Sequence, residues 1–396
     1  MKNFIFISPN FPTNYWQFCD RLKQNGINVL GIGDCPYEEL EPKLKEALTE
    51  YYKVGNMENY DEVYRAVAFL TFKHGRIDWI ESNNEYWLEK DAQLRTDFNV
   101  STGFKLEDMA KIKYKSKMKE YYQRVGIPTA KYHLVDNREG CLNFIAEVGY
   151  PVVAKPDNGV GASHTCRICS EEELDAFLGS RLPVTYIMEE CVNGQVCSYD
   201  AIVDSNGDPL FESGNVTGGS LMDVVNNGQD SFYHIVQYLP DDVREAGRKT
   251  VKSFGAKSRF VHLEFFRLLE DQEGLGAKGQ VIALEVNMRP SGGFTPEMLN
   301  YANSVDVYKI WADMIAYDHS DYEQLPHYYC AFVGRRDHVN YVLDDNSLIG
   351  KYAMEICQCC RIPDALSGAM GNTMFLAKFT DEGRMYEFYR DGMNRA

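Results

Sequence analysis

The residues best suited to chemistry lie in the segment from Val261 to Gly293, VHLEFFRLLEDQEGLGAKGQVIALEVNMRPSGG. Glu264 and Glu285 each stand inside an apolar run, where an unpaired carboxylate costs several kcal/mol and therefore requires a cation. Asn287 follows Glu285 by two residues, so in a strand its side chain shares a face with that carboxylate. Three hard oxygen donors on neighbouring strands favour magnesium, with phosphate and water completing its octahedron.

Arg289 places a fixed positive charge just beyond this oxygen cluster. A guanidinium binds phosphate or carboxylate through two parallel hydrogen bonds, which suits either a nucleotide or an acidic substrate. The alternative is that Glu264 and Glu285 are solvated residues of an ordinary hairpin, because the pattern E-x-N-x-R is short. Both interpretations stay open on this segment alone.

Two strands must position these side chains. The runs Val261–Leu269 and Gln280–Val286 have strand character, and the acidic, glycine-containing connector between them suits a hairpin loop. Pairing of the two strands would bring Glu264 and Glu285 together among hydrophobic neighbours.

A second polar stretch, Ala154–Thr165, reads AKPDNGVGASHT. Lys155 ends an apolar run, and Gly159 and Gly161 allow the following loop to turn its backbone N–H groups toward phosphate oxygens. A generic turn uses similar residues, so this loop alone does not establish a phosphate site. Before it, the basic segment from Asp108 to Arg124 has helical character and ends at a glycine with a proline beyond it.

The composition bounds the class of protein. The 396 residues carry a net charge of −17, whereas binding to a nucleic-acid backbone rests on clustered Lys and Arg. No apolar run approaches the ~18 residues of a membrane span, and the N-terminal run is too short for a signal peptide. Eleven cysteines in such a chain are typical of reduced thiols, so we expect a cytoplasmic location. Zinc binding is a minor alternative for two cysteine groups, Cys166 with Cys169 and Cys357 with Cys359 and Cys360.

The first hundred residues alternate as in a parallel α/β unit. Apolar runs with strand character alternate with amphipathic helical segments at residues 3–7, 14–24, 27–33, 61–73 and 76–82. The turn after the first run, SPNFPTN, lacks the glycines of a dinucleotide fingerprint, and no P-loop motif occurs in the chain. Glu81 and Glu85 follow the last of these runs. They could face a cleft, but we expect a solvated loop.

The remaining chain mixes helices and strands. Expected helices span residues 142–148, 241–254 and 296–317, and expected strands begin near residues 131, 151, 185, 197, 328 and 373. The Gly- and Asn-rich stretch 213–231 is long for a connection, so a substrate-facing loop and disorder are both open. Arg335 and Arg336 are further candidates for substrate contact.

Several separated motifs, in this order along the chain, resemble the ATP-grasp superfamily of carboxylate-amine ligases. They are KSKMKEYYQRVGIP, VVAKPDNGVG, MEECVNG, and the strand pair HLEF and LEVNMRPSGG. The resemblance covers roughly residues 111–317, and the preceding unit is similar to the family's usual N-terminal domain. It implies the family's fold, in which two small α+β subdomains close on ATP, and it weighs against a merely solvated hairpin.

The resemblance also assigns roles to residues. Lys115 and Lys155 would meet the nucleotide phosphates, Glu189 the adenine amino group, and backbone groups at 190 and 192 the adenine edge. The full nucleotide-binding set is Lys115, Lys155, Gly159, Gly161, Glu189, Glu190 and Val192. The metal ligands would be Glu264, Glu285 and Asn287, holding two Mg²⁺ ions, with Mn²⁺ as an alternative. Arg289 would be the catalytic residue.

Two departures from the family pattern matter. Val196 stands where the family often has a glutamate for the ribose hydroxyls, so the means of ribose recognition is not predicted. The connector between the metal strands is also long, with Asp271–Gly274 extending it, and we interpret this as a surface extension.

The activity implied by the resemblance is phosphoryl transfer from ATP to a carboxylate, followed by attack of an amine on the acyl phosphate. Two alternatives stay open: a carbamoyl-phosphate-like phosphotransferase that needs no amine, and a nucleotide-binding sensor or scaffold without ligation. The partners would be a small-molecule carboxylate and amine, with neither nucleic acid nor membrane. A homodimer is left open.

The expected organisation is a combined α/β and α+β fold in four parts. They are an open α/β unit at residues 1–108, an ATP-grasp lid subdomain at 109–190, an ATP-grasp core with the metal site at 191–320, and an α+β extension at 321–396.

Overall fold

The structure is a computed structural model and describes residues 1–159, 164–218, 231–323 and 325–396. The chain begins with the strands β1 (Asn3–Ile7), β2 (Asn28–Gly33), β3 (Glu50–Lys53) and β4 (Trp79–Glu81). Around them lie α1 (Trp16–Gln24), η1 (Tyr37–Glu39), α2 (Pro42–Ala47), α3 (Tyr60–His74), η2 (Glu85–Trp87) and α4 (Leu88–Asp97).

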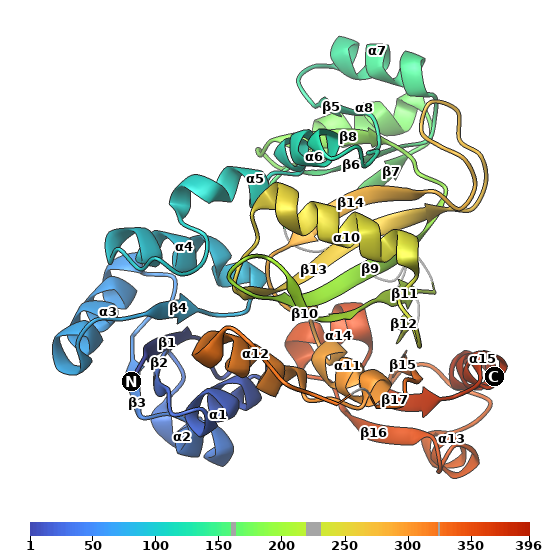
Figure 1. The fold of residues 1–396 in the computed structure, drawn as a ribbon. Helices are drawn as coiled ribbons and strands as arrows, with labels where there is room; N and C mark the ends of the chain where they lie inside the picture. The colour runs from blue at the N-terminus through green and yellow to red at the C-terminus, as the bar shows by residue number, and fades with distance from the viewer. Residues whose placement is uncertain (160–163, 219–230, 324) are drawn as a thin grey trace.

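These elements form a parallel sheet of order β3-β2-β1-β4, as the alternating pattern predicts (Figure 1). Successive residues of β1 point to opposite faces, because side chains alternate along a strand. Phe4 and Phe6 therefore pack with α1 on one face, and Ile5 and Ile7 pack with α3 on the other. We call this sheet with its helices the N-terminal unit.

A small antiparallel sheet of order β5-β8-β6-β7 follows, and we call it, with its helices, the lid. Helices α7 and α8 cover it, with Phe144 and Leu174 buried against β6 and β8. The elements of this region are η3 (Leu106–Asp108), α5 (Met109–Lys113), α6 (Lys115–Arg124), β5 (Tyr132–Leu134), α7 (Arg138–Val148), β6 (Val152–Pro156), β7 (Cys166–Ile168), α8 (Glu171–Ser180) and β8 (Tyr186–Glu190).

A larger sheet, the core, has nine strands when counted over the described residues. Its order is β14-β13-β9-β11-β12-β15-β17-β16, and β10 pairs with β9. The strands are β9 (Gly194–Val203), β10 (Pro209–Ser213), β11 (Asn215–Thr217), β12 (Ser231–Ile235), β13 (Arg259–Leu268), β14 (Val281–Asn287), β15 (Tyr329–Arg335), β16 (Ile356–Arg361) and β17 (Thr373–Phe379). The last three, β15, β16 and β17, continue the sheet from β12, so the end of the chain belongs to the same sheet as β13 and β14, the strands predicted to carry the metal ligands.

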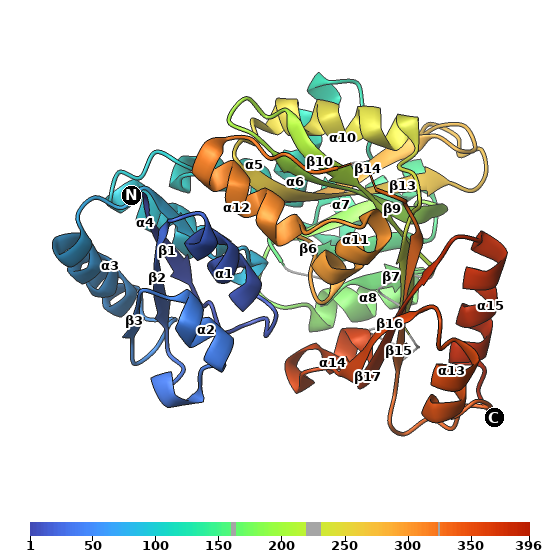
Figure 2. The ribbon, with the colours of Figure 1, turned by 60° about the horizontal axis from the view of Figure 1, so that its bottom comes forward.

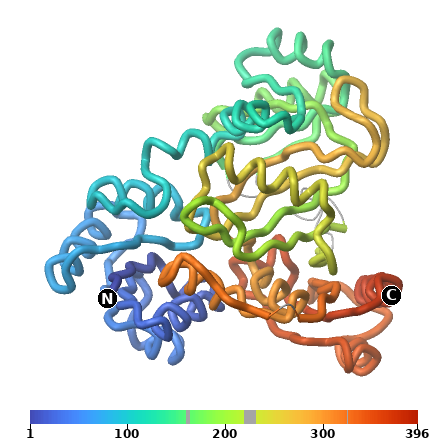
Figure 3. Tube along the Cα trace, in the orientation of Figure 1, coloured from blue at the N-terminus to red at the C-terminus, as the bar shows by residue number. Residues whose placement is uncertain are grey.

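Helices cover both faces of the core (Figure 2). Helix α10 packs on the face that carries Tyr199 and Leu263, and α12 packs on the face that carries Ile202 and Phe260. In Figure 3 the lid lies at the top, the N-terminal unit at the lower left, and the end of the chain, which includes the last strands of the core, at the lower right. The core helices are α10 (Asp241–Phe254), α11 (Thr295–Asn303), α12 (Val307–Tyr317), α13 (Asp345–Lys351), α14 (Asp364–Met370) and α15 (Glu382–Met393). In the described ranges, no helix has the length and apolar character needed to cross a membrane.

The single helix expected over residues 108–124 is instead two helices, α5 and α6. They break at Tyr114, whose backbone is extended (φ −94°, ψ 116°). Asp157 accounts for the break, because its carbonyl accepts from the Lys115 N–H at 3.0 Å and its carboxylate accepts from the Ser116 N–H at 2.8 Å. The break makes Lys115 the first residue of α6 and places it beside the loop that follows β6.

The single helix expected over residues 296–317 is also two helices, separated at Ser304, which has left-handed backbone (φ 54°). The second of them, α12, joins the core to the N-terminal unit. Trp311 packs edge-on against Phe4 and Phe18, with ring centroids 5.6 and 5.0 Å apart. This buried aromatic contact fixes the N-terminal unit next to the core.

Candidate nucleotide and metal site

The two strands predicted to carry the metal ligands, β13 and β14, form an antiparallel hairpin, which we call the metal hairpin. The register of β13 and β14 puts Glu264 directly opposite Glu285, and His262 opposite Asn287. The side chains of Glu264 and Glu285 are 25% and 21% exposed, whereas Asn287 is buried. The hairpin therefore brings together the three oxygen-bearing residues that the alternation pattern singled out, with both carboxylates accessible.

Lys115, at the start of α6, faces this hairpin. Its Nζ lies 3.4 Å from Glu285 Oε2 and donates to the carbonyl oxygen of Gly159 at 3.1 Å. Burial opposes ionisation of Glu285, but the charges of Lys115 and Lys155 outweigh it and hold the pKa of this carboxyl below its usual range. Gly159 thus lies beside Lys115, and Gly161, the other predicted loop glycine, lies outside the described residues.

Glu189, near the end of β8, forms ion pairs with two buried lysines. Its carboxylate oxygens lie 2.5 Å from Lys119 Nζ and 2.6 Å from Lys155 Nζ. Burial disfavours a charge on Glu189, but the two ammonium groups outweigh burial and lower its pKa to about 2. Sequence reasoning missed Lys119, although a signal was present. Lys119 follows Lys115 by four residues on a helix, a spacing that puts both side chains on one face.

The segment that joins β8 to β9, residues 191–193, is the hinge between lid and core. Just before it, the carboxylate of Glu190 accepts from the Lys131 N–H at 2.6 Å. Val192 packs against an apolar cluster of the metal hairpin. The connector between the metal strands also reaches the hinge, since Gln272 Nε2 donates to the carbonyl oxygen of Cys191 at 3.2 Å. The connector is a surface extension, as interpreted, because Asp271, Glu273 and Gly274 are exposed, but Gln272 within it contacts the hinge.

His262 links the metal hairpin to β9. Its Nδ1 lies 2.8 Å from Asp200 Oδ1, and its Nε2 lies 3.0 Å from Glu264 Oε1. Burial opposes protonation of this imidazole, but Asp200 and Glu264 outweigh burial and raise its pKa to about 10. His262 thus orients one of the two opposed carboxylates.

Arg289 contacts a carboxylate of the N-terminal unit. Its Nε lies 3.3 Å from Glu85 Oε2, its Nη2 donates to Asn287 Oδ1 at 3.2 Å, and its Nη1 donates to the Pro290 carbonyl at 2.8 Å. Glu85 also pairs with Lys113 at 2.8 Å, and its side chain is only 14% exposed. The expectation that Glu85 lies in a solvated loop is therefore wrong, because partners distant in sequence bury it.

Glu81 was also expected in a solvated loop, and the structure shows it buried. It is buried between Arg95 and Arg259, whose guanidinium nitrogens lie 2.9 and 2.8 Å from its Oε2. Arg259 begins β13, and its Nη1 donates to the Met288 carbonyl at 2.9 Å, just after β14. Buried ion pairs thus tie the N-terminal unit to both strands of the metal hairpin.

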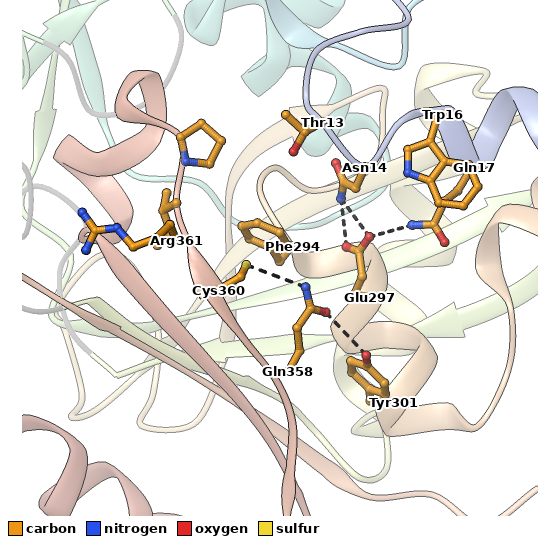
Figure 4. A pocket seen from close by; sticks show the side chains of 12 residues that line it. Thr13, Asn14, Trp16, Gln17, Phe294, Glu297, Tyr301, Gln358, Cys360 and Arg361 are labelled. Carbon is orange, nitrogen blue, oxygen red and sulfur yellow. Dashed lines mark hydrogen bonds between the residues drawn. The ribbon is translucent and has the colours of Figure 1, made fainter. Parts of the chain in front are cut away.

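A cavity of about 590 Å³ lies between the loop before α1, the start of α11 and β16 (Figure 4). Glu297 stands in its wall and accepts hydrogen bonds from Asn14 and Gln17, each at 2.9 Å, and from the Tyr308 hydroxyl at 2.6 Å. Burial raises the pKa of Glu297 to about 7. Arg361 points away from Glu297 in Figure 4. The volume suits a small molecule.

The other residues predicted to contact substrate either pack within the last segment of the chain or fall partly outside the described residues. Arg335 is buried and donates to the Gly392 and Leu343 carbonyls at 2.7 and 2.9 Å, so it serves the packing of the chain's last segment. Its neighbour Arg336 donates to the Gly368 carbonyl at 3.0 Å. Of the stretch 213–231, residues 219–230 lie outside the described residues.

The cysteines give no zinc site of the kind considered. All eleven, each within the described ranges, are free thiols. Over those ranges, one group of at least three His, Cys, Asp or Glu side chains is close enough together for one ion, and it consists of His133, Asp136 and Cys141. Neither of the two cysteine groups considered for zinc is part of this set. Burial raises the pKa of the Cys141 thiol, which disfavours the thiolate form that binds metal.

Comparison with known proteins adds distant relatives. No family model matches the chain. It is 27% identical over 197 residues to the carbamoyl phosphate synthase large chain of Clostridium botulinum, a match that spans 48% of this chain and 18% of that protein. The chain therefore spans less than a fifth of the length of this curated relative.

Solved structures match the whole chain in fold. The L-amino acid ligase of Bacillus licheniformis superposes with a TM-score of 0.70 at 15% identity, covering 100% of this chain and 98% of the ligase. The biotin carboxylase domain of a 2-oxoglutarate carboxylase from Hydrogenobacter thermophilus superposes with a TM-score of 0.69 at 15% identity, covering 99% and 89% of the two chains. The predicted fold class is confirmed, and the chain has the fold of the ATP-grasp superfamily.

Proposed function

We propose that this chain is an ATP-dependent ligase that forms a C–N bond between a carboxylate and an amine through an acyl phosphate, with release of ADP and phosphate. The observation that carries the proposal is the register of β13 and β14, which sets Glu264 opposite Glu285, with Lys115 3.4 Å from the latter. Opposed carboxylates beside a lysine suit a metal-bound phosphate chain. The likeness of the fold to ligases of this kind points the same way.

Glu264, Glu285 and Asn287 would hold the metal. The donor set fits Mg²⁺, because it consists of carboxylate and amide oxygens, and the two facing carboxylates have more negative charge than Lys115 alone balances. Bound Mg²⁺ neutralises phosphate charge and orients the phosphates. The similar biotin carboxylase domain is described with ADP and magnesium. Two ions, and Mn²⁺ as a substitute, are part of the proposal.

The nucleotide would lie between the lid and the core. Lys115 and Lys155 supply positive charge for the phosphates, and the loop of Gly159 and Gly161 supplies backbone N–H groups. The adenine would meet the end of β8 at Glu189 and Glu190, and the hinge at Val192. Because Glu189 already binds Lys119 and Lys155, we expect it to position these ammonium groups as well as to face the base.

The chemical steps need positioning and charge rather than a protein nucleophile. A carboxylate oxygen of the substrate attacks the γ-phosphorus, and the bond to the bridging oxygen of ADP breaks. The amine nitrogen then attacks the acyl carbon, loses a proton, and expels phosphate. Arg289 would hold the transferring phosphoryl group and the acyl phosphate, and Glu85 would hold the Arg289 guanidinium in place from the N-terminal unit.

A second candidate, a phosphotransferase that needs no amine, is favoured by the sequence match to a carbamoyl phosphate synthase. A third, a nucleotide-binding sensor, keeps the fold without turnover. An ADP-release screen over carboxylates, with and without amines, separates the three. We expect ADP release that requires both substrates. Release without an amine would favour the phosphotransferase, and ATP binding without release would favour the sensor.

The organisation of the chain is part of this proposal. We divide it at residues 108, 190 and 320, which separates the parallel sheet, the lid, the part of the core with the metal hairpin, and the last segment, whose strands continue the core sheet. The identity of the carboxylate and amine follows from the screen. Size-exclusion chromatography with light scattering tests whether a homodimer forms, as the dimeric biotin carboxylase domain suggests.

A further inference from the structure

The connector between the metal strands, residues 269–280, is longer than a hairpin needs, because two residues suffice to join antiparallel strands. It is nevertheless ordered by its own contacts. Gln272 and Gly276 exchange backbone hydrogen bonds of 2.9 and 3.0 Å. Leu275 is buried in a cluster with Leu268 and Ile282, residues of the two metal strands. The connector is thus a folded element anchored on the core, and Figure 3 shows it reaching up beside the lid.

Gln272 contacts three residues at or just before the hinge, Glu190, Cys191 and Asn193. Its Nε2 donates to the Cys191 carbonyl at 3.2 Å and lies 3.4 Å from Glu190 Oε2, and its Oε1 accepts from the Asn193 N–H at 3.2 Å. A primary amide offers donors and an acceptor on one planar group. Gln272 therefore matches a carbonyl, a carboxylate and an N–H at once, which a purely acidic or basic side chain cannot do.

Other contacts bind the connector and the hinge together. The Leu269 N–H donates to the Asn193 carbonyl at 3.0 Å. Both the N–H and the carbonyl of Asn193 therefore form hydrogen bonds with the connector. Val192 packs in the same apolar cluster as Leu275. On the lid side, the second oxygen of Glu190 accepts from the Lys131 N–H at 2.6 Å. The Glu190 carboxylate thus lies between the lid and the connector.

We infer that the connector is a latch that sets the hinge between lid and core, and that Gln272 is a positioning residue for nucleotide binding. The inference rests on the proposed function, because that proposal assigns the hinge to the adenine. Residues 190–193 leave the lid sheet and enter the core sheet, so a side chain that fixes their peptide groups also fixes the direction in which the hinge presents its remaining groups. Pre-organisation of that kind raises affinity without touching the reacting atoms.

The test compares Gln272→Ala and Gln272→Glu with the control Glu273→Ala, which alters an exposed residue of the same connector. Without nucleotide, we expect hydrogen exchange of peptides covering 190–196 to accelerate about 3- to 10-fold in Gln272→Ala, as for loss of one or two net hydrogen bonds. ATP affinity should fall by about the same factor, whereas kcat at saturating ATP should stay within about twofold. The control should match the wild type.

The charge-changing variant Gln272→Glu gives the more sensitive test. Gln272→Glu would put a second carboxylate beside Glu190, so we expect a larger effect than in Gln272→Ala and partial recovery in the double variant Gln272→Glu/Glu190→Gln. Unchanged exchange at the hinge in both Gln272 variants would overturn the latch. Faster exchange with unchanged ATP affinity would overturn the positioning role. If the wild type binds no ATP, the proposed function fails, and the exchange measurement alone decides whether the latch exists.

Discussion

The two ends of the candidate site have opposite charge imbalances. At the hinge end, one carboxylate, Glu189, meets two buried lysines at 2.5 and 2.6 Å. At the metal-strand end, two carboxylates stand opposite each other, and among the described residues Lys115 is the lysine in contact, 3.4 Å from Glu285. Because an uncompensated charge with little exposure is costly, the hinge end calls for an anion and the metal-strand end for a cation.

His262 does not cancel the imbalance at the metal-strand end. Its pKa is raised to about 10, so it is positively charged at neutral pH, but it is shared between Glu264 and the fully buried Asp200. A ligand with a divalent cation at one end and phosphates beside it matches both ends at once. Under the proposed function, the two ends would bind parts of one metal–nucleotide complex, and substitutions at each end test this separately.

The largest effect should come from the metal-strand end. We expect Glu285→Ala, and likewise Asn287→Ala, to reduce ADP release by about 10³-fold or more, because loss of a hard oxygen ligand leaves the phosphate charge uncompensated. Circular dichroism should be unchanged, since under the proposed function both groups would serve a metal rather than the core. Turnover equal to wild type at saturating Mg²⁺ would show that these oxygens hold no metal.

Arg289 should affect the chemical step. Arg289→Lys keeps the charge but loses the planar fork, so we expect the single-turnover rate to fall by about 10²-fold while ATP affinity stays nearly constant. The opposing view is that Arg289 only pins the following turn, which its 2.8 Å bond to the Pro290 carbonyl would serve. A large drop in melting temperature with normal single-turnover chemistry would favour that view.

Lys155 tests the hinge end. Lys155→Met removes one of the two cations on Glu189, and we expect ATP affinity to fall about 10- to 30-fold, as for loss of a charged hydrogen bond. A matched control is Lys131→Met, because Lys131 has an exposed ammonium paired with Glu147. Affinity within about twofold of wild type, or about 0.4 kcal/mol, would remove Lys155 from the phosphate site.

Glu297 extends the comparison to a carboxylate whose partners, within the described ranges, are two amides and a hydroxyl rather than a lysine. Its pKa is raised from 4.5 to about 7 by burial, whereas the pKa of Glu189 is lowered to about 2. Between pH 4.5 and about 7, the Glu297 carboxyl holds its proton in the native protein more fully than in the unfolded chain. The contribution of Glu297 to the free energy of unfolding is therefore lost as pH rises from about 4.5 through about 7. Over this window, we expect the wild type to lose up to about 3 kcal/mol more than Glu297→Gln. Parallel pH profiles of urea unfolding for the two proteins would refute the raised pKa.

Local patterns predicted the parts of the fold that depend on local physics. The strands around Glu264 and Glu285 follow from apolar runs and alternation, and the register confirms their pairing. Helix boundaries were less accurate where a distant residue competes for the backbone. The break at Tyr114 requires Asp157, which captures the N–H groups of Lys115 and Ser116. No feature of residues 108–124 alone reveals that competition.

In the candidate site too, local patterns predict some residues, whereas others depend on contacts with distant parts of the chain. Glu81 ends a short strand and Glu85 follows it in a polar segment, which locally resembles a solvated loop. Their partners Arg259 and Arg289 belong to the β13–β14 region, with Glu81 and Arg259 separated by 178 positions. Lys119 could have been found, because its spacing from Lys115 is helical. The contact of the connector with the hinge could not, since it depends on how two subdomains meet.

Titration calorimetry of a non-hydrolysable ATP analogue, with Mg²⁺ and with EDTA, tests the opposite-charge account most directly. The account predicts that Mg²⁺ raises affinity about 10-fold or more in the wild type, and that Glu285→Ala abolishes this gain while keeping the EDTA affinity nearly unchanged. It also predicts that Lys155→Met lowers affinity in both conditions and keeps the Mg²⁺ gain. An equal Mg²⁺ gain in the wild type and in Glu285→Ala would contradict the account.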